Sequence, residues 1–459
     1  MEFVTTSVLA AALCLGLAVL RPYRGLWVFM ITLPLGAVAA VNLPRFGGTS
    51  ILITDVAVVV LVLAMLLRRD GPGEAAGTLR PFQPGFWLLG VVVITVLSGL
   101  FFPRLFLGQT DVFVIARTEG VLGIVSRPLA PTYGNISQAL RQVLSALAFV
   151  ALATLFRRVP DPRPVVVAMA AATALTLVLA LLDLGSHALG WPDALDWLRS
   201  ANYQILDRQV VLGLKRLVAG YPEPAALGYY ALGLFGFWLR MAIGGQPWAL
   251  VATLALGALV LRTTSSAAYL ALAMFLLLVL FWQFRSLRPA AMHPVQVGVL
   301  SGLGALIPLV TLGLVMAYGL VPGVASYFDT VLFGKLTSQS GVERMAWNRQ
   351  AFVNLVDTRL VGAGIGAVRG SGWLGVTLAS IGVLGTALYL GFLASVLRGQ
   401  KRAERDPNLV VSALKYGCVA VFLQALLSRS VPNLDTAFFA MAGLSVGLGR
   451  GMMLRERPG

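Results

Sequence analysis

Residues 165–184 read VVVAMAAATALTLVLALLDL, and the one charged side chain among them, Asp183, lies near the end of the stretch. An α-helix rises about 1.5 Å per residue and needs about 20 mainly apolar residues to cross the hydrocarbon core of a bilayer. A stretch of this length and composition therefore predicts a transmembrane helix.

Similar apolar runs recur along the whole chain. We count roughly thirteen, most of them about 17–25 residues long. They are Phe3–Leu20, Leu26–Leu43, Ile51–Leu67, Phe86–Phe102, Arg141–Phe156, Val165–Leu184, Ala225–Ile243, Trp248–Leu261, Ser266–Phe284, Val295–Tyr318, Trp373–Leu397, Val410–Leu427 and Val431–Leu448. The expected fold is an all-α polytopic integral membrane protein with about 12–14 transmembrane helices, in a single membrane domain over residues 1–459.

The composition supports this fold class. The chain has 459 residues, of which 58% are hydrophobic and 12% charged, and its mean hydropathy is +0.85. Soluble domains average about 45–50% apolar and about 25% charged residues. The net charge of +16 is spread between the apolar runs and forms no basic tail. This distribution argues against a nucleic-acid-binding protein and favours membrane lipids or an anionic substrate as partners.

Cysteine and histidine are too few to support a metal site. Cys14 and Cys418 both lie within apolar runs, where a thiol behaves as a small hydrophobe, so we expect no disulfide framework. The sequence contains only two histidines, His187 and His293, which are too few for a zinc site without a cysteine cluster. We therefore expect neither a metal nor another cofactor.

The arginines of the short connections indicate the orientation of the chain. Compact basic pairs such as Arg68 and Arg69, or Arg157 and Arg158, are typical of cytoplasmic loops. This places the N-terminus outside the cytoplasm and the C-terminus inside. The chain then divides into N-terminal helices (residues 1–184), an outer loop (185–224), central helices (225–318), a large outer loop (319–372) and C-terminal helices (373–459).

Three long connections, residues 103–140, 185–224 and 319–372, are expected on the outer face. They carry many basic side chains: Arg104, Arg117, Arg127, Arg199, Arg208, Lys215, Arg216, Lys335, Arg344, Arg349, Arg359 and Arg369. Two explanations stand. The side chains bind an anionic ligand, or they extend towards lipid headgroups. Because long structured connections often carry function, we expect the site there.

The third long connection contains a short amphipathic helix. The sequence Ser340-Gly-Val-Glu343 has the form of a capping box, which predicts a helix from Ser340 to about Asp357. Its apolar side chains recur at helical spacing, at Met345, Phe352 and Val356. Arg349 shares this stripe, and Arg344 and Asn348 occupy the neighbouring stripe. The alternative to a binding role is an interfacial helix whose arginines reach lipid headgroups.

The second long connection ends in KRLVAGYPEP, residues 215–224, directly before an apolar run. Prolines on both sides restrict the backbone around Glu223. This carboxylate lies close in sequence to Arg216, so Glu223 is a candidate general base towards a sugar hydroxyl while Arg216 holds a phosphate. The alternative is an acidic side chain favoured by the dipole at a helix start.

A turn rich in hydroxyl groups follows one hairpin later, in residues 262–269, which read RTTSSAAY. Serine and threonine commonly cap the following helix, which is the ordinary interpretation of such a cluster. Arg262 at its start is placed to reach the same outer site.

These segments together resemble a known family. In order, they are AGYPEP (219–224) followed by LGYY (227–230), TTSSAAY (263–269), an Arg-x-x-Trp helix (Arg344, Trp347), VGAGIG (361–366) and IGVLG (381–385). Their order and sidedness resemble the O-antigen ligase and polymerase superfamily, in particular its exopolysaccharide-polymerase branch. The resemblance covers about residues 215–397.

The resemblance implies a glycosyltransferase of the bacterial inner (cytoplasmic) membrane, with its active site facing the periplasm. The donor would be an undecaprenyl-diphosphate-linked oligosaccharide and the acceptor a growing polysaccharide, with inversion at the sugar and without a metal. A flippase and a chain-length regulator are further implied partners. The residues expected to be catalytic are Glu223, Arg216 and Arg344. Those expected to bind substrate are Lys215, Arg208, Arg262, Arg349, Asn348 and Trp347.

Two departures from the family pattern bear on the acceptor. Many ligases have Ser-Arg-Gly in the hydroxyl-rich turn, where this chain has Ser265-Ser-Ala267. Ligases also tend to have a histidine after the large loop, whereas residues 366–372 offer Arg369 and Ser371. Both departures favour a polymerase over an O-antigen ligase that transfers to lipid A core. A lipid-linked oligosaccharide flippase, a secondary transporter and a scaffolding subunit remain alternatives of other classes.

Overall fold

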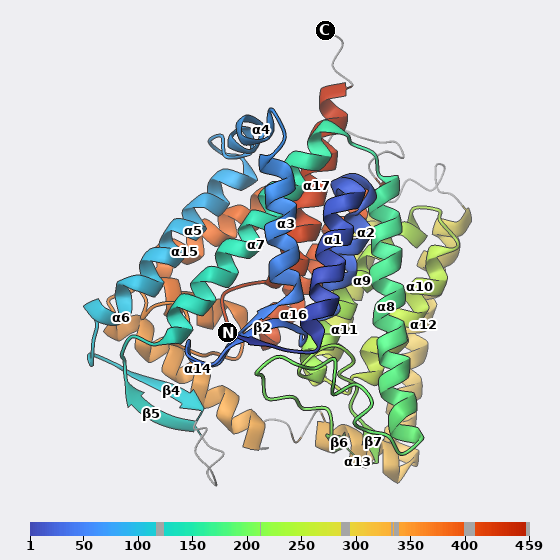
Figure 1. Ribbon diagram of the computed structural model, residues 1–459. Helices are drawn as coiled ribbons and strands as arrows, with labels where there is room; N and C mark the ends of the chain where they lie inside the picture. Colours follow the sequence, from blue (N-terminus) through green and yellow to red (C-terminus); the bar gives the residue numbers. More distant parts are fainter. Residues whose placement is uncertain are drawn as a thin grey trace.

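The computed structural model describes residues 1–115, 124–211, 213–285, 294–331, 334, 339–398 and 409–455, and α-helices dominate it (Figure 1). Helices suit this sequence because a bilayer offers no water to backbone groups, so each apolar segment must satisfy its own hydrogen bonds. The elongated helices are α1 (Thr6–Arg24), α3 (Ile53–Leu66), α5 (Pro84–Leu100), α7 (Tyr133–Arg158), α8 (Arg163–Ala188), α9 (Pro224–Ile243), α10 (Ala249–Arg262), α11 (Ser266–Arg285), α12 (Pro294–Leu320), α15 (Trp373–Arg398), α16 (Leu409–Ser428) and α17 (Asp435–Arg455).

Eight helices in the described ranges are long and apolar enough to cross a membrane. A ninth span exists if the second half of α12 and the following helix α13 (Pro322–Val331), which bend by 107°, count as one. Three more apolar helices are shorter: α1, α3 and α10. The all-α polytopic membrane fold is therefore confirmed, and the described residues contain fewer full-length spans than the 12–14 helices expected from hydropathy.

One predicted span is wrong. Residues 26–43 form the short helix α2 (Leu26–Thr32), a turn, and a strand at Ala39–Leu43, instead of one transmembrane helix. Pro34 and Gly36 lie directly after α2, and both residue types are unfavourable in a helix interior. The high hydropathy of this stretch predicts correctly that most of it is buried, but it does not predict the conformation of the backbone.

Short β-hairpins occupy the same end of the bundle as the long connections (Figure 1). An antiparallel sheet joins β1 (Glu2–Phe3), β2 (Ala39–Leu43) and β3 (Thr49–Leu52), and two further antiparallel pairs are β4 (Asp111–Ile115) with β5 (Ile124–Pro128) and β6 (Val210–Val211) with β7 (Leu214–Lys215). In the first sheet Asn42 lies opposite Ser50. The Ser50 hydroxyl donates to Asn42 Oδ1 (2.7 Å) and accepts from the Asn202 N–H (2.8 Å), which attaches the second long connection to this sheet.

The remaining short elements are α4 (Gly71–Thr78), α6 (Phe102–Leu105) and α14 (Gln339–Asp357). Helix α14 confirms the helix predicted from Ser340 to about Asp357. The predicted apolar stripe is largely exposed, at Met345, Phe352 and Val356, whereas Ala351 and Leu355 on the other side are buried.

We call the end of the bundle that carries β4–β7, α13 and α14 the loop end. Figure 1 shows these elements together at the bottom of the view, and α4 with the last turns of α17 at the opposite end. The parts of the three long connections that the structure describes therefore gather at one end. Two of their basic residues, Arg117 and Lys335, lie outside the described residues.

The tightest helix packing joins α7 to α17 through glycine. Gly443, Gly447 and Gly451 recur every four residues on one face of α17. A Cβ atom on Gly447 would lie 2.7 Å from the Ala153 carbonyl oxygen of α7. Small residues at this spacing let two helix backbones approach closely, which replaces the hydrophobic driving force that is missing between helices in lipid.

A leucine at Gly447 should therefore separate α7 from α17. We expect Gly447→Leu to destabilise the protein by about 1–3 kcal/mol or more, seen as a lower unfolding temperature in detergent. The control is Gly302→Leu in α12, where a Cβ meets no atom within 4 Å. Equal unfolding temperatures for the two variants would contradict this account of the packing.

The orientation can be tested with cysteines at the two ends. In a background where Cys14 and Cys418 are replaced by alanine, Ser126→Cys in β5 should react with an impermeant thiol reagent added to spheroplasts. Ala76→Cys in α4 should react only after the membrane is permeabilised. Both positions are exposed, so access to the side chain does not limit the reaction. The reverse pattern would overturn the orientation inferred from the arginines.

Candidate functional site

A cavity of about 1010 Å³ opens at the loop end. Its wall is formed by β4, the connection around residues 202–206, the start of α9, one face of α14 and the segment 366–371. Among the described residues that line the cavity, Ser428, the last residue of α16, is the one that belongs to a long span. The cavity is therefore built from connections and helix ends, and not at the middle of the bundle.

Glu223 lines this cavity as the residue that precedes α9. Pro224 occupies the first helical position, where its missing N–H costs no hydrogen bond, and it favours an extended residue before it. Glu223 is accordingly extended, with φ −148° and ψ 154°. The Pro222 carbonyl accepts from the Leu206 N–H (2.7 Å). The backbone around Glu223 is thus held as the sequence predicted, and its side chain is exposed to the cavity.

Arg216 is held by two polar side chains. Its Nε donates to Thr264 Oγ1 (3.1 Å) and its Nη1 donates to Gln209 Oε1 (2.7 Å). Burial lowers the pKa of the Arg216 guanidinium, the nearby carboxylate of Glu223 acts in the opposite direction, and the charge of Arg344 lowers it further. In the structure, the charge of Arg216 therefore interacts with the charges of the other two predicted catalytic residues.

The hydroxyl-rich turn does more than cap a helix. Thr264 lies between α10 and α11 with φ 52°, a left-handed conformation that is uncommon for a threonine and clusters at functional sites. Its hydroxyl accepts from Arg216 and donates to the Thr263 carbonyl (2.8 Å). The turn therefore orients the Arg216 guanidinium. Arg262 donates to the Lys215 carbonyl (2.7 Å), so it supports the same strand, and it is not among the residues that line the cavity.

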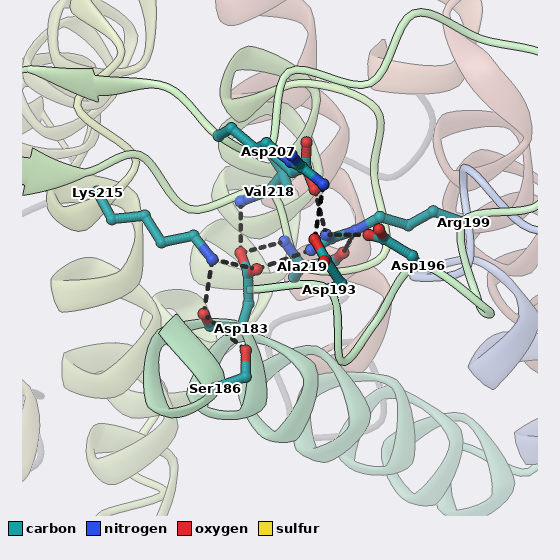
Figure 2. Close-up of polar contacts among 10 residues, drawn as sticks. Asp183, Ser186, Asp193, Asp196, Arg199, Asp207, Lys215, Val218 and Ala219 are labelled. Carbon is teal, nitrogen blue, oxygen red and sulfur yellow. Dashed lines mark hydrogen bonds and ion pairs between the residues drawn. The ribbon is translucent and has the colours of Figure 1, made fainter. Parts of the chain in front are cut away.

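Lys215 belongs to a buried ion network and not to the cavity wall (Figure 2). Its Nζ donates to Asp183 Oδ1 (2.8 Å), and Arg199 Nη2 donates to the same oxygen (2.7 Å). The second oxygen of Asp183 accepts from the N–H groups of Val218 (3.0 Å) and Ala219 (3.1 Å). The side chains of the three charged residues are at most 3% exposed. Lys215 is therefore unavailable to a substrate, which corrects the sequence prediction.

The network continues towards the surface through Arg199, whose Nη1 pairs with Asp207 (3.0 Å). Arg199 Nε also donates to the Ala219 carbonyl (3.2 Å). Figure 2 shows Asp183 at the end of its helix, with Lys215 reaching it from one side and Arg199 from the other. This arrangement fixes the backbone that leads from β7 to Glu223.

Helix α14 divides the remaining predicted residues. Arg344 and Trp347 line the cavity. Asn348 instead accepts from the Ser371 N–H (2.7 Å) and donates to the Ser371 carbonyl (3.2 Å), so it joins α14 to the segment 366–371. Arg349 is exposed on the apolar face and is not part of the cavity wall, contrary to the predicted binding role.

Arg208 is also outside the cavity. It pairs with Asp193 at 2.7 Å on the surface, where the two side chains are 71% and 64% exposed. An exposed pair of this kind contributes little to stability, and Arg208 is not among the residues that line the cavity.

Sequence reasoning missed two lining residues, Tyr203 and Phe113, and named a third, Arg369, only among the basic residues of the outer connections. The Tyr203 hydroxyl accepts a hydrogen bond from Arg141 of α7, and nothing in the sequence signals this contact. Arg369 had a signal in the preceding glycines, because Gly366 has φ 78° and a Cβ there would lie 2.3 Å from the Gly134 carbonyl oxygen. A chain that turns so closely against α7 is held in place, and so is the arginine that follows it.

Within the ranges that the structure describes, no three His, Cys, Asp or Glu side chains gather into a group that would hold a metal ion. The cavity offers one carboxylate, guanidinium groups and aromatic rings. Such a set suits a ligand that carries both anionic oxygens and sugar-like hydroxyls.

Comparison with known proteins adds no assignment: no known family's sequence pattern matches this chain, and no curated protein is significantly similar to it.

The buried network makes a stability prediction. Asp183→Asn leaves Lys215 and Arg199 without their common carboxylate, so we expect a loss of about 3–5 kcal/mol, measured by thermal unfolding or by the folded yield in detergent. Asp193→Asn is the matched control, because it breaks an exposed pair and should cost less than about 1 kcal/mol. Similar losses in the two variants would show that burial of the network is not what makes it important.

Proposed function

We propose that this protein is a membrane glycosyltransferase that polymerises undecaprenyl-diphosphate-linked glycan units at the outer face of the bacterial inner membrane. One observation carries the proposal: Glu223 and Arg344 line the same large cavity, and Arg216 interacts electrostatically with both. A base and two cations at one end of an apolar bundle suit a reaction in which a lipid-anchored diphosphate leaves.

The arginines would stabilise the leaving group. A lipid diphosphate gains negative charge as its bond to the sugar C1 breaks, and guanidinium groups fixed beforehand stabilise this charge without reorganising. Arg216 is fixed by Thr264 and Gln209, and α14 places Arg344 at the cavity wall. Arg349 was expected to complete this clamp, and Arg369, which lines the cavity, is better placed to do so.

Glu223 would act on the acceptor. In this step the acceptor hydroxyl oxygen forms a bond to C1, its proton passes to the Glu223 carboxylate, and the bond between C1 and the diphosphate oxygen breaks. The electron pair of that bond leaves with the lipid diphosphate. Attack from the face opposite the leaving group inverts the configuration at C1. General-base catalysis of this type contributes about 10²–10⁴-fold.

The aromatic side chains fit the sugar portion of the substrate. Trp347, Tyr203 and Phe113 line the cavity, and aromatic rings offer a large apolar surface to the C–H faces of pyranose rings. The volume of about 1010 Å³ lies at the upper end of the range of about 300–1000 Å³ that is common for small-ligand pockets. An oligosaccharide is therefore a better match than a single sugar.

Two rival functions make different demands on this cavity. A secondary transporter or flippase usually binds its substrate near the middle of the bilayer, in broken helices. The cavity here is lined by connections and helix ends, which disfavours that class. An O-antigen ligase would use the same donor chemistry, and only the missing histidine and the Ser265-Ser-Ala267 sequence argue against it.

The deciding experiment is incubation of the purified protein with a lipid-linked repeat unit, followed by separation of the products by size. A ladder of products with loss of the lipid identifies a polymerase. A single transfer to lipid A core identifies a ligase, and no transfer with movement of the lipid-linked glycan across vesicles identifies a flippase.

The clamp is tested by substitution of its arginines. Arg216→Ala and Arg344→Ala should each abolish polymer formation or reduce it severely without loss of folded protein. Lysine at either position should restore little activity, because an ammonium group cannot bind two phosphate oxygens in a planar fork. Arg349→Ala is the matched control on the same helix and should retain near-normal activity. Full activity of both lysine variants would refute the clamp.

The role of Glu223 is tested by Glu223→Gln, which preserves the shape of the side chain and removes its basicity. We expect turnover to fall by about 10²–10⁴-fold while binding of the lipid-linked donor is unchanged. Donor binding is measured separately with a non-reactive lipid diphosphate. Unchanged turnover would mean that Glu223 only positions Arg216, and that stabilisation of the leaving group is sufficient.

A further inference from the structure

A second cavity, of about 580 Å³, lies at the end of the bundle opposite the loop end. Its wall is formed by α4 and its flanking turns, the last residues of α7 and Leu454 at the end of α17. Helix α4 packs against α7, and Figure 1 shows it at the top of the bundle, away from the site described above.

Four arginines and two carboxylates line this cavity, namely Arg69, Arg80, Arg157, Arg158, Asp70 and Glu74. The carboxylates are already engaged, because Arg158 lies 3.4 Å from Asp70 and 3.7 Å from Glu74. The other three arginines have no hydrogen bond or ion pair to a side chain among the residues that the structure describes. The cavity therefore keeps a net positive charge that no acidic side chain of the described chain neutralises.

A fifth arginine strengthens this excess. Arg450 lies one turn before Leu454 on α17, and residues four apart share a helix face. Its Nη1 is buried without a hydrogen-bond partner in the described part of the chain, and the charge of Arg157 acts on it repulsively. A buried guanidinium N–H without a partner is costly, and the nearby positive charge of Arg157 adds to this cost, so an anion bound here would stabilise Arg450.

Two glycines of α4 contribute no side chains to the cavity wall near Arg157. Gly73 and Gly77 lie on one face of α4, and a Cβ atom on Gly77 would come within 3.3 Å of Arg157 Nη1. The missing side chain at Gly77 therefore leaves room for the Arg157 guanidinium close against α4, at the wall of the cavity. One apolar side chain among the lining residues, Leu454, is 50% exposed.

We propose that this cavity binds the phosphate headgroup of an anionic phospholipid of the cytoplasmic leaflet. The arginines would hold the phosphate oxygens, and the exposed side chain of Leu454 would lie along the first part of an acyl chain. Basic pockets between transmembrane helices on the cytoplasmic side are suited to such headgroups, and each basic residue strengthens binding appreciably. The inference is independent of the glycosyltransferase proposal, because none of these residues lines the other cavity.

The test uses the purified full-length protein in detergent, titrated with phosphatidylglycerol and, separately, with zwitterionic phosphatidylcholine. Bound lipid is counted by native mass spectrometry. We expect selective retention of phosphatidylglycerol, weakened about tenfold or more in the double variant Arg80→Gln with Arg157→Gln. The matched control, Arg285→Gln with Arg398→Gln, removes the same charge from exposed helix ends elsewhere and should bind within about twofold of wild type.

A second variant separates a change in lipid binding from a loss of folding. Asp70→Asn with Glu74→Gln removes the competing carboxylates and should bind phosphatidylglycerol several times more tightly. Equal losses in the two arginine double variants, or no gain in the carboxylate variant, would overturn the proposal. Complete displacement of the lipid by an excess of inorganic phosphate would also overturn it, because the cavity would then be a site for a soluble anion.

Discussion

The candidate site depends on one buried carboxylate. Asp183 lies at the end of α8, where it accepts hydrogen bonds from two cationic side chains and from two consecutive backbone N–H groups. Burying a lone charge would cost more free energy than folding can supply. Here each oxygen of Asp183 accepts two hydrogen bonds, and the charges of Lys215 and Arg199 are offset by Asp183 and Asp207. The backbone held in this way is the one that carries Arg216 and ends at Glu223. The network therefore helps to fix the path of the long connection between α8 and α9.

The walls of the cavity are joined by polar contacts between segments far apart in sequence. Asn202 is tied to Ser50 in the β2–β3 hairpin, and Asn348 of α14 is tied to Ser371. Each contact satisfies a backbone group that would otherwise be unpaired in a connection with no regular ladder. Site residues from connections that meet only in space are thereby fixed relative to one another, which is a requirement for any arrangement that acts through preorganised charge.

The features that could be predicted from this sequence depend on neighbouring residues, and those that could not depend on contacts between distant ones. Apolar runs predicted most helices, a capping sequence predicted α14, and two prolines predicted the backbone at Glu223, because each depends on neighbouring residues. The strand at Ala39–Leu43 was missed because hydropathy does not distinguish a buried strand from a buried helix. The role of Lys215 was misassigned for another reason: its partner, Asp183, is 32 residues away, and no spacing rule relates the two. Arg349 was predicted to bind substrate but lies outside the cavity wall. Helical periodicity gives the directions of side chains relative to one another, but it does not show which face of the helix points to the cavity.

The position of Glu223 has an evolutionary consequence. It precedes α9, and 89% of the apolar core of that helix is buried within the protein, the highest share among the eight long spans. The surrounding walls come from surface connections, which tolerate insertions and substitutions far better than packed helices do. Evolution could therefore replace the connections that line the cavity, and so change the shape of the cavity, while Glu223 keeps its position at the start of α9. Diversification in this architecture would proceed by loop replacement around a stationary acidic group.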